Sequence, residues 1–283
     1  MKRILTITFL AAALLITQVE FAAAQDDLTT TPPFKIFDNL YYVGLRGVSS
    51  FAVRTSAGLI LIDATYEESS AEVIKSLQQA GLNPRDIKYI IVTHAHSDHA
   101  AGAPAIQALS GARVGMAEGD WDMYAKGGYM SSGGQQRVFP ALKRDLVIKD
   151  GDTLTLGDTT MKFYVTPGHT PGVTSLEFQV ADGARKYKTV MFGGTGLNTV
   201  NGVRTTEQYI ASVRRMMALP DLQVNITNHP AGAQVFQRRD KLMARKAGDP
   251  HPFVDPAGFK AYFADLLANA EKKLAAEKAA NRP

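Results

Sequence analysis

The sequence contains no cysteine among its 283 residues. This absence excludes a disulfide framework and removes thiolate from the side chains that can bind a metal ion. Two nucleophile motifs are also missing, because neither Ser-x-x-Lys nor Gly-x-Ser-x-Gly occurs in the chain. The sequence therefore does not indicate a hydrolase with a serine nucleophile of these types.

Charge of one sign is not concentrated anywhere in the chain. The formal net charge is +4, and the basic residues are scattered, with only short pairs such as Arg238-Arg239 and Lys272-Lys273. Binding of nucleic acid requires a clustered basic surface. We therefore expect no nucleic-acid partner and at most a mild preference for anionic small molecules.

Long hydrophobic runs are absent except at the N-terminus. Lys2 and Arg3 precede an apolar run over residues 4–16, and three alanines at residues 22–24 offer a cleavage site before Gln25. This pattern is typical of a secretory signal peptide over residues 1–24 and is too short for a membrane span. We expect a periplasmic or secreted protein with no membrane attachment after cleavage; an uncleaved anchor is the alternative.

The stretch richest in chemistry is His-Ala-His-Ser-Asp-His at residues 94–99, which follows a short β-branched and aromatic run at residues 88–92. Residues two apart in an extended segment share a face, so His94 and His96 can point at one ion. Asp98 and His99 follow where the chain leaves that path, and can bind a neighbouring ion. Imidazole and carboxylate suit zinc, and three protein ligands leave one position open for water.

Two further histidines stand at the ends of predicted strands. His169 lies in Thr-Pro-Gly-His-Thr-Pro-Gly, a rigid turn suited to hold a ligand outside a sheet, and His229 precedes Pro230 after another strand. We expect both to bind metal. The sixth histidine, His251, is flanked by prolines in a predicted loop and has no assigned role. Asp63 ends an apolar strand, where it can cap a turn or accept a hydrogen bond from a ligand histidine.

Strand and helix patterns alternate in both halves of the chain. The motif His-x-His-x-Asp-His, followed by small residues, resembles the metallo-β-lactamase superfamily. The resemblance implies an α/β αββα sandwich, with two mixed sheets packed face to face and helices outside. It covers residues 34–265, and we expect one domain over residues 25–283 with a C-terminal helix at about 255–281.

The resemblance also implies a division of the ligands between two zinc ions. The first ion is assigned to His94, His96 and His169, and the second to Asp98, His99 and His229. The histidine-only first site and the missing cysteine are most similar to class B β-lactamases of the third subclass. For that subclass we expect hydrolysis of β-lactam antibiotics by a hydroxide shared between two zinc ions, with Asp98 orienting the hydroxide.

Three glycines, Gly193, Gly194 and Gly196, stand where related enzymes have other residues. Many thioesterases, lactonases and phosphodiesterases of the superfamily place a metal-bridging Asp where this chain has Gly193-Gly194, which disfavours those activities. Lactamases usually have serines near Gly194 and Gly196, so Thr195 and Asn198 are the candidate contacts for the substrate carboxylate. The alternatives are a zinc hydrolase acting on lactones or esters, and a zinc-binding relative without catalysis.

Overall fold

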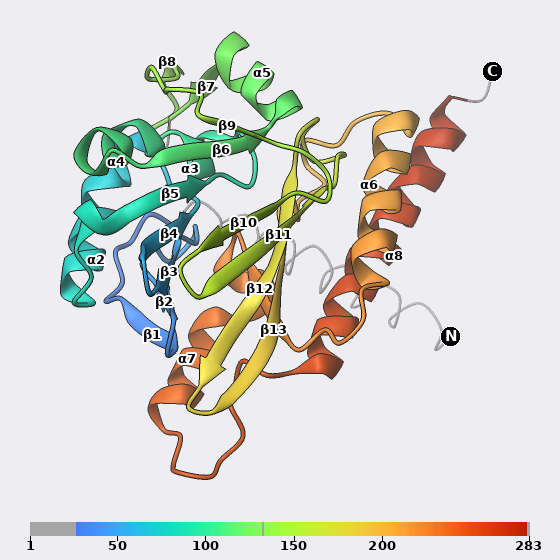
Figure 1. Cartoon of the computed structure of the whole chain (residues 1–283). Coiled ribbons are helices and arrows are strands. Elements are labelled where there is room, and N and C mark those ends of the chain that lie inside the picture. Colours follow the sequence, from blue (N-terminus) through green and yellow to red (C-terminus); the bar gives the residue numbers. More distant parts are fainter. Residues whose placement is uncertain (1–26, 132, 282–283) are drawn as a thin grey trace, which may run out of the picture.

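The computed structural model describes residues 27–131 and 133–281 (Figure 1). The expected signal peptide at residues 1–24 lies outside the described residues. Within the described part of the chain, no helix is both long and apolar enough to span a bilayer. Two sheets pack face to face between layers of helices, and the expected αββα architecture is confirmed.

The first sheet contains mixed strand directions. Its seven strands are Phe34–Phe37 (β1), Leu40–Tyr42 (β2), Phe51–Thr55 (β3), Gly58–Ile62 (β4), Ile87–Ile91 (β5), Arg113–Ala117 (β6) and Leu146–Ile148 (β9). They are ordered β1-β2-β3-β4-β5-β6-β9. The first four are antiparallel neighbours, whereas β4, β5, β6 and β9 run parallel. The carboxyl ends of β4 and β5 therefore meet at one edge.

The second sheet is mostly antiparallel. Its five strands are Thr153–Leu156 (β10), Thr159–Val165 (β11), Thr174–Asp182 (β12), Arg185–Phe192 (β13) and Val224–Thr227 (β14). They lie in chain order, and only β13 and β14 pair in parallel. A separate hairpin of Gly128–Met130 (β7) and Gln136–Val138 (β8) is formed by a stretch rich in glycine and polar residues.

Helices cover the outer faces of both sheets, as the left and right sides of Figure 1 show. Those of the first half are Ser70–Gln79 (α2), Ser97–Ala100 (α3), Ala103–Ser110 (α4) and Glu118–Lys126 (α5), with 3-10 turns at Glu67–Ser69 (η1) and Pro84–Asp86 (η2). Those of the second half are Val203–Met217 (α6), Val235–Met243 (α7) and Pro256–Ala280 (α8), with a 3-10 turn at Pro230–Ala233 (η3). The long helix α8 packs along α6.

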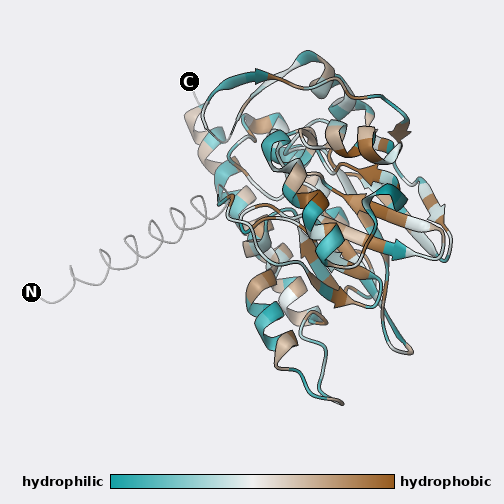
Figure 2. Ribbon diagram, turned by 90° about the vertical axis from the view of Figure 1, so that its left-hand side faces the viewer, coloured by the Kyte–Doolittle hydropathy of each residue, from teal (hydrophilic) through white to brown (hydrophobic). Residues whose placement is uncertain are grey.

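Alternation along the strands builds separate apolar layers. In β4, Ile60 and Ile62 face the cluster between the two sheets, whereas Leu59 and Leu61 face the helices of the first half. A strand buried on both faces needs such a continuous apolar run. Figure 2 shows the hydrophobic residues gathered on the strands and the hydrophilic ones on the outward turns of the helices. This packing fixes the strand ends that carry the polar residues described next.

Candidate metal centre

Three histidines converge from the two halves of the molecule. His94 and His96 follow β5, and His169 stands in the turn after β11. The Nε2 atom of His169 lies 3.2 Å from Nε2 of His94 and 3.1 Å from Nδ1 of His96. Two nitrogens bound to one tetrahedral zinc ion would be separated by roughly 3.3 Å. The spacing of this first ligand set therefore fits a zinc ion.

A second ligand set lies beside the first. The Oδ2 atom of Asp98 is 3.0 Å from Nε2 of His99 and 3.5 Å from Nε2 of His229. Asp98 and His99 belong to α3, and His229 follows β14. The Nε2 atom of His99 is buried and points at the Asp98 carboxylate. One carboxylate oxygen and two imidazole nitrogens thus lie within 4.8 Å of one another, and this donor set also fits a zinc ion.

Backbone carbonyls hold three of the ligand rings in place. Nδ1 of His94 lies 2.8 Å from the carbonyl oxygen of Gly193, and Nδ1 of His169 lies 2.8 Å from that of Gly196. Nδ1 of His229 lies 2.9 Å from the carbonyl oxygen of Gly47. Because a carbonyl only accepts, each Nδ1 carries the hydrogen and each Nε2 presents its lone pair. This is the outer support that metal-binding histidines typically have.

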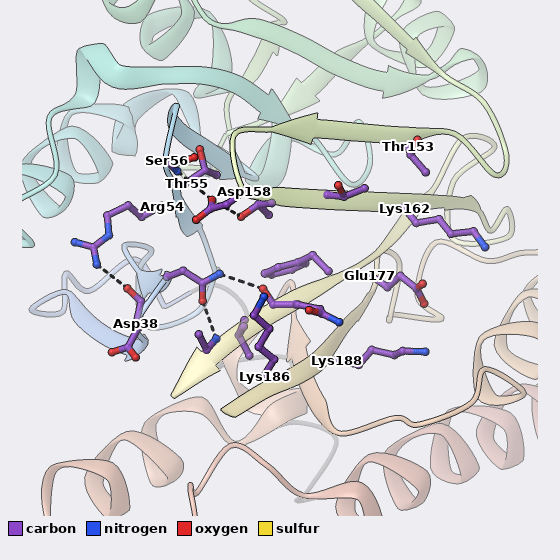
Figure 3. Close-up of a pocket in the computed structure, with 17 residues that line it drawn as sticks. Asp38, Arg54, Thr55, Ser56, Thr153, Asp158, Lys162, Glu177, Lys186 and Lys188 are labelled. Atoms are coloured by element: carbon purple, nitrogen blue, oxygen red, sulfur yellow. Dashed lines mark hydrogen bonds between the residues drawn. The ribbon is translucent and has the colours of Figure 1, made fainter. Parts of the chain in front are cut away.

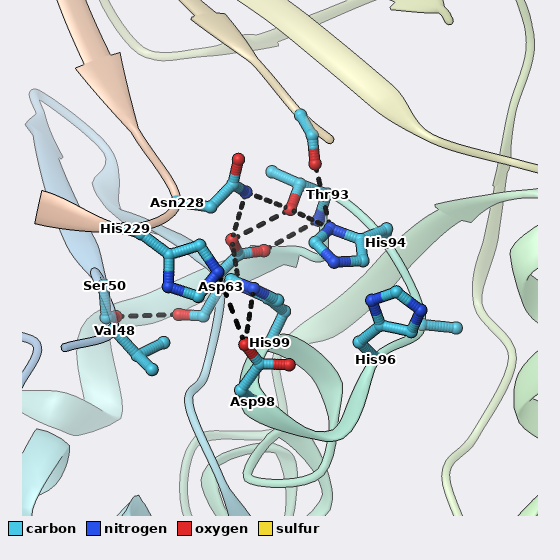
Figure 4. A network of polar contacts seen from close by, with 12 residues as sticks. Val48, Ser50, Asp63, Thr93, His94, His96, Asp98, His99, Asn228 and His229 are labelled. Carbon is cyan, nitrogen blue, oxygen red and sulfur yellow. Dashed lines mark hydrogen bonds and ion pairs between the residues drawn. The ribbon is translucent and has the colours of Figure 1, made fainter. Parts of the chain in front are cut away.

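His99 is supported by a carboxylate instead. Asp63, at the end of β4, places Oδ2 3.0 Å from Nδ1 of His99 (Figure 4). The same carboxylate accepts hydrogen bonds from the backbone and hydroxyl of Thr93 at 2.7 and 2.9 Å and from the amide of Asn228 at 3.0 Å. Of the two roles left open by the sequence, the structure places Asp63 as an acceptor for a histidine of the second ligand set.

Burial makes the first ligand set available at neutral pH. Loss of solvation lowers the pKa of His94 well below its ordinary range, with help from the neighbouring histidines. The same cause lowers the pKa of His96 to about 4 and that of His169 to about 3. These imidazoles are therefore neutral near pH 7, and a metal ion need not displace a proton from them.

Two members of the second ligand set, His99 and Asp98, have the opposite electrostatics, whereas burial lowers the pKa of His229 as it does in the first set. Burial opposes charge on His99, but the carboxylates of Asp98 and Asp63 outweigh burial and raise its pKa to about 10. Burial also opposes ionisation of Asp98, but His99 and the other histidines lower its pKa below the usual range. Before metal binds, the pair is an imidazolium and a carboxylate. A metal ion at this set must displace the proton of His99.

A cleft of about 500 Å³ opens onto both ligand sets. Thr195 and Asn198, the candidate substrate contacts, both line it, as does Thr199. The apolar and aromatic residues of the lining are Tyr66, Met123, Tyr129, Met130 and Phe139. No lysine or arginine is among the described residues that line the cleft. Its volume suits a small molecule.

A larger groove of about 810 Å³ lies away from these residues, on strands β10 to β13 beside the turn after β3 (Figure 3). It is lined by charged residues of both signs, including Arg54, Asp158, Lys162, Glu177 and Lys186. The two histidine and aspartate clusters found among the described residues both lie at the smaller cleft, and five of their six residues line it. That cleft is therefore the candidate site.

The family follows from comparison with known proteins. The family model described as the metallo-beta-lactamase superfamily matches residues 43–184. A subclass B3 metallo-beta-lactamase of Bradyrhizobium japonicum superposes with a TM-score of 0.81 at 32% identity, over 92% of this chain and 100% of that one. The chain belongs to the metallo-beta-lactamase superfamily. The resemblance to the third subclass of class B β-lactamases is confirmed.

Other relatives extend the comparison in two directions. The native metallo-beta-lactamase of Legionella gormanii superposes with a TM-score of 0.79 at 26% identity, over 88% of this chain and 98% of that one. A hydroxyacylglutathione hydrolase of Maricaulis maris is 33% identical over 159 residues, which are 56% of this chain and 53% of that protein. A second one, from Cereibacter sphaeroides, is 29% identical over 57% of this chain and 54% of its own length. The chain thus spans about half the length of these curated relatives.

Several residues near the site escaped the sequence analysis. Tyr129 lies in a stretch rich in glycine and serine, and Asn228 stands directly before His229 after a predicted strand, so neither has a local signature of its own. Asp120 resembled an ordinary acidic residue in the first turn of a helix, where it would favour the helix dipole, yet it is fully buried. His251 is not near the metal residues: it is buried and stacks on Phe37 with ring centroids 3.9 Å apart.

Proposed function

We propose that the chain is an exported zinc-dependent β-lactamase that hydrolyses the amide bond of β-lactam antibiotics. The observation that carries the proposal is the lack of space at Gly193 and Gly194. A Cβ at Gly193 would collide with the carbonyl oxygen of Thr174, and one at Gly194 would lie 2.7 Å from Cβ of His169. The bridging Asp expected in thioesterase-type and lactonase-type relatives therefore has no room here.

Two zinc ions fit the two ligand sets. Their donors are imidazole nitrogens and one carboxylate, which suit zinc, and each set supplies three protein ligands. Zinc at such sites lowers the pKa of a coordinated water to about 7 and polarises a carbonyl group. In this proposal the first ion takes His94, His96 and His169, and the second takes Asp98, His99 and His229.

Side chains of the cleft orient the water molecule and bind the substrate. Asp98 is ionised and partly open to the cleft, so its carboxylate can orient a water molecule that enters between the two ligand sets. Thr195 and Asn198 stand on the wall beside His169 and can donate hydrogen bonds to the substrate carboxylate. Met130 and Phe139 are apolar parts of the lining and can exclude water from a bound substrate.

The test is hydrolysis of a chromogenic cephalosporin and a carbapenem by the mature chain, with added zinc and with a chelator. We expect chelator-sensitive turnover that His94→Ala abolishes. Asp98→Ala should reduce turnover by orders of magnitude, whereas the matched control Asp122→Ala, an exposed residue of α5, should retain it. Absence of β-lactam turnover in a chain that binds zinc would refute the proposed substrate.

A second candidate activity is hydrolysis of an ester or thioester. It is favoured by the sequence match to hydroxyacylglutathione hydrolases, although the glycines at 193 and 194 oppose it. The same preparation should be assayed with a hydroxyacyl thioester of glutathione and with a lactone. Turnover of either without β-lactam hydrolysis would select this activity, and zinc binding without any turnover would select a non-catalytic zinc-binding protein.

Export to the periplasm or the medium is part of the proposal. It is supported by the basic, apolar and small-residue segments of residues 1–24. Fractionation of cells that produce the full chain should recover a product shortened by this segment outside the cytoplasm. A full-length product retained in the cytoplasm would contradict it.

A further inference from the structure

Asp120 is a buried carboxylate that belongs to neither ligand set. It lies in the first turn of α5, is 0% exposed, and is not among the residues that line the cleft. A buried carboxylate is costly unless its oxygens are hydrogen-bonded. Its hydrogen-bond partners therefore indicate which segments of the chain the carboxylate stabilises.

Three hydrogen bonds reach this carboxylate from two different segments. Oδ2 accepts from the backbone N–H of Ala95 at 3.0 Å and from the hydroxyl of Thr170 at 2.8 Å. Oδ1 accepts from the backbone N–H of Gly172 at 2.8 Å. Ala95 stands between His94 and His96, and Thr170 directly follows His169. One side chain thus joins the two segments that deliver all three histidines of the first ligand set.

Helix α5 and the turn that contains His169 pack closely against each other. A Cβ at Gly172 would lie 3.0 Å from Cβ of Asp120, and a Cβ at Gly119 would lie 2.9 Å from Cβ of Pro171. A larger residue at either glycine would push α5 away from the turn. The backbone contact therefore fixes where the carboxylate meets its three donors.

The charge of Asp120 is balanced by dipoles alone. Burial raises its pKa to about 6, and the opposing influences are the hydrogen bonds from Thr170, Gly172 and Ala95. No charged side chain contributes to this balance among the described residues. Among the described residues, the carboxylate therefore forms hydrogen bonds with the two segments that carry the ligand histidines and forms no ion pair.

We propose that Asp120 is a positioning residue that sets the spacing of His94, His96 and His169. Without its carboxylate, the His94–His96 segment and the His169 turn no longer share a hydrogen-bond partner. The three ligand nitrogens then no longer converge at the spacing that a metal ion requires. The first site should then bind metal more weakly, whereas the second site, built from Asp98, His99 and His229, should change little. The inference rests on metal binding, which is part of the proposed function.

The experiment compares Asp120→Asn with Asp122→Asn, a matched change on the exposed face of the same helix. Both are made in a His229→Ala background, which disables the second site, and are titrated with cobalt and with zinc against a competing chelator. Loss of outer support for a metal ligand typically weakens affinity about 10–100-fold. We expect that loss, together with altered cobalt absorption bands, for Asp120→Asn and neither change for Asp122→Asn.

A second background separates positioning from a general loss of structure. In His94→Ala, which disables the first site, Asp120→Asn should leave the affinity of the second site within about twofold of the parent, since outer support for that site is elsewhere. Equal weakening of both sites, or an unchanged first site, would overturn the proposal. If the parent chain binds no cobalt, that result would contradict both the proposed function and the positioning role.

Thr170→Val provides a milder variant if Asp120→Asn fails to fold. It keeps the carboxylate and removes only the hydroxyl donor at 2.8 Å. We expect the same direction with a smaller loss of first-site affinity, of several-fold. First-site affinity and cobalt spectrum unchanged from the parent would overturn the proposal in that case.

Discussion

The Nδ1 atom of His99 lies 3.0 Å from the Oδ2 atom of Asp63, and both side chains are fully buried. This contact orients the ring so that Nε2 faces Asp98 and His229. The orientation of a ligand of the second site thus depends on a residue that would not itself bind the metal.

Replacement of Asp63 by Asn should weaken the second site. The amide retains one acceptor oxygen but loses the charge that His99 faces, so we expect a loss of affinity of about 10–100-fold. Zinc competition in the His94→Ala background measures it, and Asp86→Asn, at an exposed carboxylate, is the control. Unchanged affinity would show that the ring is held by other contacts.

Zinc occupancy of the two sites should respond differently to pH. The pKa of His99 is raised to about 10, so below that value a proton competes with the metal, and second-site affinity should fall about tenfold per pH unit. The pKa values of His96 and His169 lie near 4 and 3, so first-site affinity should hardly change between pH 8 and 6. Zinc titrations at these two pH values check the difference; parallel losses at both sites would contradict it.

The hairpin of β7 and β8 is anchored outside the cleft by Glu67. Its carboxylate accepts a hydrogen bond from the hydroxyl of Tyr129 at 2.6 Å and lies 3.4 Å from Arg137. Glu67→Gln removes the charge, at a cost of about 0.5–1 kcal/mol for partly exposed contacts. We expect faster amide exchange in Gly128–Met130 and a KM raised a few-fold with little change in kcat. Glu72→Gln, whose partner Lys75 is on the same helix, should leave both unchanged.

The cap of the long C-terminal helix should contribute stability only above acidic pH. Asp255 accepts from the backbone N–H of Gly258 at 2.9 Å, and this bond, together with Arg238, lowers its pKa despite partial burial. Asp255→Ala should lower the free energy of unfolding by about 1 kcal/mol at pH 7. Since the folded pKa lies below the unfolded value of about 3.9, the difference should shrink as pH falls below about 4.

Denaturant titrations of the metal-free chain at pH 7 and pH 3 measure the contribution of this cap. Asp265→Ala, an exposed change on the same helix, is the control and should alter stability little at either pH. A difference between Asp255→Ala and the parent that persists at pH 3 would show that packing, not the ionised cap, is responsible.

The sequence was most informative where chemistry and chain geometry coincide locally. His94 and His96 are two residues apart after a strand, so the sequence predicted that they point at one ion; they do converge, although residues 93–96 form bends beyond the end of β5. The assignment of His169 and His229 to particular sites needed the family resemblance, because a single histidine in a turn does not reveal which strand ends meet. The two-sheet layout likewise rested on the resemblance together with the alternation of elements.

Long-range contacts explain what the sequence could not reveal. Two of the three donors to Asp120 are backbone groups of distant segments, and backbone groups carry no signature in a sequence. Asp63 adopts a left-handed backbone with φ of 58°, which only the surrounding packing can enforce. The β7–β8 hairpin is polar and rich in glycine, and cross-strand pairing overrides that weak local preference.

Each proposed metal site draws its ligands from both halves of the chain, since His169 joins two residues of the first half and His229 joins two others. A bound ion would therefore act as a reversible cross-link between the two sheets. Ligand that binds only the folded chain stabilises it by about 2.7 kcal/mol at a concentration one hundred times Kd. The free energy of unfolding would then depend on the concentration of free zinc. A chelator would weaken the contact between the two sheets as well as remove metal from the cleft.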